Sequence, residues 1–153
     1  SWFAPVAALA FGVVATLGIV RMLPSAAVPV DEIVQARGTL PASYVGILTD
    51  ASGAAVAIAS STRHGRTMSI KVLRPIEAPP GKMLQLWALP KDGEPFPLGV
   101  VPREGKGAFE MADTSDRLLE SVPRLAVSIE DAPVRPGAAP EGFILTGHCV
   151  KLW

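Results

Sequence analysis

Few side chains of this 153-residue chain suit acid–base, nucleophilic or metal chemistry: two histidines, His64 and His148, and one cysteine, Cys149. No His-Glu-x-x-His or Cys-x-x-Cys motif occurs, and no pair has metal-ligand spacing. His148 and Cys149 are adjacent in a predicted strand, so their side chains should point to opposite faces and cannot act together as base and nucleophile. We expect His64, in the loop 60–66, to be solvated. This inventory predicts no catalytic, metal or cofactor site, and therefore no enzyme.

The charge pattern and the glycine spacing argue against nucleic-acid and phosphate ligands. The 14 basic and 14 acidic residues are spread along the chain, and no basic patch predicts a nucleic-acid partner. Gly105-Lys106-Gly107 lacks the strand and turn before it, and the helix after it, that a phosphate-binding loop requires. A single cysteine excludes an intrachain disulfide, so the folded part must depend on its apolar core.

An uncharged apolar segment at residues 2–20 predicts a single transmembrane helix over residues 1–22, in contact with a lipid bilayer. At about 1.5 Å per residue the segment would be roughly 28 Å long, close to the ~30 Å hydrocarbon core of a membrane. Arg21 follows it and, by the positive-inside bias, favours a cytoplasmic side for the rest of the chain. The larger side chains expected to lie in the membrane are Trp2, Phe3, Leu9, Phe11, Val14, Leu17 and Val20.

Residues 23–41 form a predicted juxtamembrane stalk, in which Pro24, Pro29 and Pro41 interrupt any helix. From residue 42 to 153, short apolar runs alternate with turn residues at the spacing of an antiparallel β-sandwich. We expect this mainly β domain to be Ig-like or similar, with about seven or eight strands and one short helix.

The expected short helix spans residues 113–120, with Asp113 as its N-cap and Asp116 in the capping-box position. Residues 90–97 and 132–142 are predicted loops. The strands are expected at residues 43–49, 54–59, 67–73, 82–89, 98–101, 107–111, 124–130 and 143–152.

The strand at 82–89 is apolar on both faces, which predicts a central strand buried on both sides. An aromatic side chain in such a strand, Trp87, is expected to pack in the core rather than contact a partner. The same strand holds the sequence Gln85-Leu86-Trp87, and it is followed by Pro90, Asp92-Gly93 and the run Pro97-Leu98-Gly99-Val100.

This Gln-Leu-Trp strand, with the Gly/Pro loop and Leu-Gly strand after it, resembles the signature of the anti-sigma-K factor family. Residues 44–50 are similar to the opening hairpin of that family, and residues 142–147 to its closing strand. Residues 125–130 are similar to its Ala-Val-Ser-Ile-Glu-Pro strand, although Asp131 and Ala132 here precede the proline. With the apolar span, the resemblance covers roughly the whole chain.

The resemblance implies a membrane-tethered anti-sigma factor whose C-terminal domain is periplasmic, in the inner membrane, with the N-terminal side inside. It overrules Arg21 on orientation. In this family a cytoplasmic helical domain holds a sigma factor until an external signal triggers proteolysis, and the stalk is the natural first cleavage site. That helical head is missing from these residues, so the sigma factor would be a partner only through a domain outside them.

A second interpretation is a single-pass accessory or structural subunit of a larger membrane complex that reuses the periplasmic module. Ala4, Ala8 and Gly12 recur every fourth residue and form a candidate face for packing against other membrane helices. A ligand-binding module is a third interpretation, which no set of cavity-lining polar residues supports.

Overall fold

The computed structural model describes residues 43–152, which form a mainly β domain with eight strands and one short helix. The predicted membrane helix, its packing face and the stalk lie outside the described residues. Within residues 43–152 there is no helix long and apolar enough to cross a membrane. The elements are β1 Ser43–Thr49, β2 Ala55–Thr62, β3 Thr67–Val72, β4 Met83–Leu89, β5 Phe96–Val101, β6 Lys106–Glu110, α3 Ser115–Leu119, β7 Arg124–Glu130 and β8 Leu145–Lys151.

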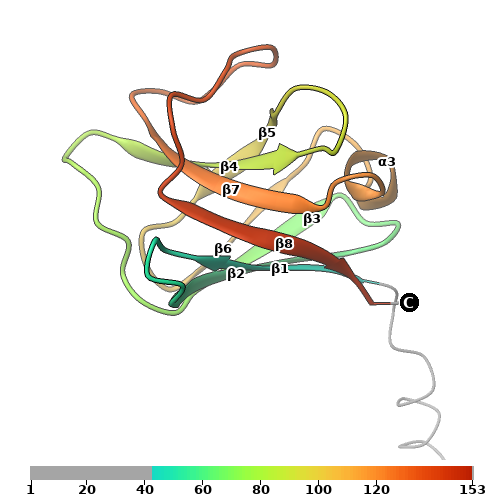
Figure 1. Ribbon diagram of the computed structural model, residues 1–153, viewed down its shortest axis with the longest axis horizontal. Helices are drawn as coiled ribbons and strands as arrows, with labels where there is room; N and C mark the ends of the chain where they lie inside the picture. The colour runs from blue at the N-terminus through green and yellow to red at the C-terminus, as the bar shows by residue number, and fades with distance from the viewer. Residues whose placement is uncertain (1–42, 153) are drawn as a thin grey trace, which may run out of the picture. The chain divides into compact units, whose positions relative to one another are not determined.

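All eight strands belong to one antiparallel sheet in the order β5-β4-β7-β8-β1-β2-β3-β6. The sheet curls until its two edge strands face each other, which gives a nearly closed barrel (Figure 1). A Cβ at Gly99 of β5 would lie 2.3 Å from the Phe109 ring of β6, so the ring lies directly against the β5 backbone. The predicted two-sheet, Ig-like sandwich is therefore wrong, while its antiparallel strands and single helix are confirmed. Alternation of side chains defines a buried face but not how many sheets share it.

Strand alternation builds the core. In β3, Met68, Ile70 and Val72 are buried and the residues between them are exposed, which is the period of a half-buried strand. The described core lies inside the curled sheet and includes Tyr44, Leu48, Ala57, Ala59, Met68, Ile70, Leu84, Leu86, Leu98, Met111, Leu119, Leu125, Val127 and Leu145.

Two predicted boundaries are corrected. Strand β5 begins at Phe96 inside the expected loop, and Pro97 is tolerated there because β5 lies at a sheet edge beside a register shift in β4. The helix begins at Ser115 with Thr114 as N-cap and no side-chain cap, so the capping box predicted from Asp113 and Asp116 is wrong. The Asp113 Oδ1 atom instead accepts a hydrogen bond from the Thr114 N–H, at 2.8 Å.

Candidate functional site

The strand that carries the sequence signature, β4, is buried on both faces, as predicted for a central strand. It pairs with β5 on one side and with β7 on the other. Leu86 belongs to the core cluster. Gln85 and Trp87 are buried on the opposite face, and Trp87 is 0 % exposed. The side chains of these three residues are therefore not accessible to a partner at the surface of the described domain.

Hydrogen bonds fix the two polar members of the signature. The Trp87 Nε1–H donates to Ser128 Oγ of β7 at 2.7 Å, and the Ser128 hydroxyl donates to Glu130 Oε1 at 2.5 Å. The Gln85 Nε2 donates to the Gly99 carbonyl of β5 at 2.9 Å. The Trp87 and Gln85 contacts each join β4 to a neighbouring strand and supply a buried polar atom with a partner. The signature therefore serves to hold three strands in register.

The residues considered for chemistry lie apart. His64 is exposed, with its Nδ1 3.6 Å from Asp116 Oδ2. His148 is exposed, whereas Cys149 is partly buried against the core, so the two point to opposite faces as expected. Burial raises the pKa of the Cys149 thiol to about 11, which keeps it protonated at neutral pH. Among residues 43–152, no three His, Cys, Asp or Glu side chains are grouped so that they could hold a metal ion.

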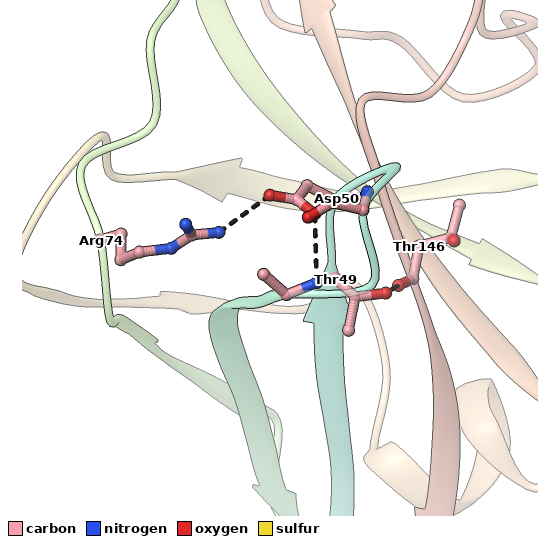
Figure 2. Close-up of polar contacts among 6 residues, drawn as sticks. Thr49, Asp50, Arg74 and Thr146 are labelled. Atoms are coloured by element: carbon pink, nitrogen blue, oxygen red, sulfur yellow. Dashed lines mark hydrogen bonds and ion pairs between the residues drawn. The ribbon is translucent and has the colours of Figure 1, made fainter.

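A polar cluster that sequence reasoning missed closes the β1–β2 turn (Figure 2). Asp50 Oδ1 accepts hydrogen bonds from Ser52 Oγ at 2.6 Å, Ser52 N at 2.9 Å and Ala54 N at 3.1 Å. Its Oδ2 accepts a hydrogen bond from Arg74 Nη2 at 2.8 Å, which ties the turn to the segment after β3. The Ser52 hydroxyl, followed by Arg74, lowers the pKa of Asp50 to about 2. This arrangement fixes the turn and offers no acid–base chemistry near neutral pH.

Replacing Asp50 with asparagine should lower the melting temperature at neutral pH, because the amide cannot reproduce the charge-assisted hydrogen bonds to Ser52 and Arg74. The pKa of Asp50 is about 2 in the folded domain against 3.8 for an ordinary aspartate. Its contribution to stability is therefore complete above about pH 4 and disappears as the pH falls towards about 2. Melting curves of both proteins from pH 7 to pH 2 should converge at the acid end; a constant difference would contradict this assignment.

The family comparison matches this chain over residues 2–144 with the family model described as Anti-sigma-K factor rskA, C-terminal. The chain belongs to this family. The matched residues of this anti-sigma-K factor domain include both the apolar segment 2–20 and the signature strand β4. No curated protein and no solved structure matches the chain.

The described part of this anti-sigma-K factor domain carries one strongly apolar exposed surface. Its three most exposed large hydrophobic residues are Ile47, Val150 and Leu152, at 52, 50 and 53 %. They come from β1 and from β8 and the residue after it, and they lie together around a hollow of about 410 Å³. Clustered exposed apolar side chains mark interaction sites more often than single ones do. We name as the apolar outer face the residues that line this hollow: Val45, Ile47, Thr49, His148, Val150 and Leu152.

Sequence reasoning missed the apolar outer face, although a signal for it exists. Strand β1 is apolar at Tyr44 and Leu48, which face the core, and also at Val45 and Ile47, which face outward. The two-faced pattern that identified β4 as a central strand is thus present in β1 as well. In β4 the second face is buried within the domain, whereas in β1 it is left open.

Proposed function

We propose that this chain is the membrane-tethered, extracytoplasmic module of an anti-sigma factor. One observation carries the proposal: the family match extends from residue 2, so it treats the apolar segment and the β domain as one unit. A sigma factor would be bound by a helical domain on the other side of the membrane, connected through the span. The β domain would then act as the external sensor, and cleavage in residues 23–41 would start the release of the sigma factor.

The contacts within the β domain suit a sensor that transmits its state through binding rather than through chemistry. The signature residues are used for cohesion, since Trp87 and Gln85 join β4 to β7 and β5. The exposed part of the domain instead offers the apolar outer face, which includes residues of the first strand, β1. We expect the external signal, a ligand or a protein, to bind at this face.

Capture of the native gene product from membranes tests this function. An affinity tag after Trp153 should retrieve a sigma factor of the extracytoplasmic-function type, and a variant lacking residues 2–20 should fail to reach the membrane. A phosphatase that is active only outside the cytoplasm, fused at the same end, should be active. Absence of any sigma factor from the captured material, or a silent phosphatase fusion, would refute the proposal.

A second candidate is an accessory subunit of a larger membrane complex. It is favoured by the Ala4, Ala8 and Gly12 spacing, which permits close contact between helices, and by the apolar outer face. The same capture experiment separates the two functions: stable recovery of other membrane subunits without a sigma factor would support the accessory role.

A further inference from the structure

A second hollow adjoins the apolar outer face, and this one is basic. Ile47 of β1 lies opposite Ile58 of β2, and Ile58 lies opposite Lys71 of β3. Lys71 in turn lies opposite Lys106 of β6. Side chains of residues paired in this way share one face of the sheet. Ile58, Lys71 and Lys106 line the second hollow, which has a volume of about 450 Å³. One row of side chains therefore leads across the outside of the sheet from an apolar hollow to a positively charged one.

The two lysines at the end of this row are available for a partner. Lys71 and Lys106 are exposed, and neither forms an ion pair within residues 43–152. They are cross-strand neighbours of like charge, an arrangement that is unfavourable without a counter-charge. A carboxylate supplied by a partner would relieve this repulsion. The charge at this end of the row is therefore complementary to an acidic ligand, whereas the other end is complementary to an apolar one.

The spacing along the row fits an extended peptide. Neighbouring strands of a sheet lie about 4.8 Å apart, so Lys71 and Lys106, two and three strands from Ile47, are roughly 10 and 14 Å from it. In an extended segment every second side chain points to the same side, and residues four apart are separated by ~13 Å. A segment laid across the strands can therefore place apolar side chains over Ile47 and Ile58 and, four residues further on, carboxylates beside the two lysines.

We propose that this row binds an extended segment of a second protein, in which apolar residues are followed four positions later by acidic ones. The apolar side chains fill the hollow of the apolar outer face, and the carboxylates pair with Lys71 and Lys106. Projecting side chains of a peptide fit two hollows better than the flat surface of a bilayer does. A second copy of the domain fits poorly, because the row is basic at both ends: beyond the apolar outer face, Arg124 of β7 lies opposite His148. The inference rests on the proposed function, since this segment would be the signal that the domain senses.

Binding of a synthetic peptide to the full 153-residue chain in zwitterionic lipid nanodiscs tests the proposal. The probe is rhodamine-labelled Ser-Val-Ser-Ile-Ser-Glu-Ser-Glu-Ser, which places its apolar and acidic side chains on one side of an extended backbone. We expect fluorescence anisotropy to show saturable binding, weakened about tenfold by Lys71→Glu with Lys106→Glu, because two attractive charge pairs become repulsive. The same peptide with lysine in place of both glutamates should show the reverse preference and bind the charge-reversed chain more tightly, which also shows that this variant is folded.

Lys91→Glu with Arg135→Glu is the matched control, because it makes the same charge change at exposed positions that line neither hollow; it should leave binding within about twofold. Ile47→Ser should weaken both peptides alike, since it removes an apolar contact. Failure of the probe to bind at millimolar concentration, or an equal loss with the control variant, would overturn the proposal. Competition by vesicles of equal parts phosphatidylglycerol and phosphatidylcholine, but not by phosphatidylcholine alone, would overturn it in favour of an anionic lipid surface. The assay contains no sigma factor, so its failure would leave the capture experiment, and the proposed function, standing.

Discussion

Replacing Trp87 with alanine is expected to lower the free energy of unfolding by about 3–5 kcal/mol, the range for truncating a large buried aromatic. The indole is fully buried, and its strand β4 is paired with β5 and with β7, so its truncation leaves a cavity on a strand held on both sides. The substitution also removes the donor to Ser128. Urea unfolding of the full 153-residue chain, followed by circular dichroism, measures this loss of free energy.

Two further variants separate the ring from its hydrogen bond. Ser128→Ala keeps the indole but leaves its Nε1–H without the acceptor it has at 2.7 Å, and an unsatisfied buried donor costs about 1–3 kcal/mol. Trp87→Phe keeps most of the apolar volume and should fall between Ser128→Ala and Trp87→Ala. A loss below about 1 kcal/mol for Trp87→Ala would show that the signature strand does not carry the stability assigned to it.

Local patterns in the sequence predicted most strands because short apolar runs are separated by turn residues, and strands such as β3 also alternate. In β3, Met68 and Ile70 face the core and Ser69 and Lys71 face outward, and in β7 Leu125 and Val127 belong to the core cluster. The family resemblance, drawn from the Gln-Leu-Trp strand, is confirmed by the match over residues 2–144.

The closure of the sheet could not be predicted in the same way, because it depends on residues far apart in the sequence. Gly99 and Phe109 bring the two edge strands together, yet neither position differs locally from a strand in a two-sheet sandwich. The Asp50–Arg74 contact joins residues 24 positions apart, and the exposed cross-strand neighbours Lys71 and Lys106 come from β3 and β6. Charge that is balanced along the chain can still be concentrated on one surface after folding.

Gly147 of β8 lies tightly against the backbone of β1, and Gly147→Ala is expected to destabilise the domain by about 3 kcal/mol or more, at or above the usual range for overpacking. A Cβ there would lie 1.9 Å from the carbonyl oxygen of Ile47 and 2.7 Å from its carbonyl carbon. Both are backbone atoms of β1, so no side chain can rotate away, and β1 and β8 would have to separate.

Gly142→Ala is the matched control, because a Cβ there meets nothing within 4 Å; it should change stability by less than about 0.5 kcal/mol. The two variants are compared by urea unfolding, and equal stabilities would contradict the close approach. Strands β1 and β8 also carry the apolar outer face. The stability of the barrel and the shape of its apolar outer face therefore depend on the same pair of strands.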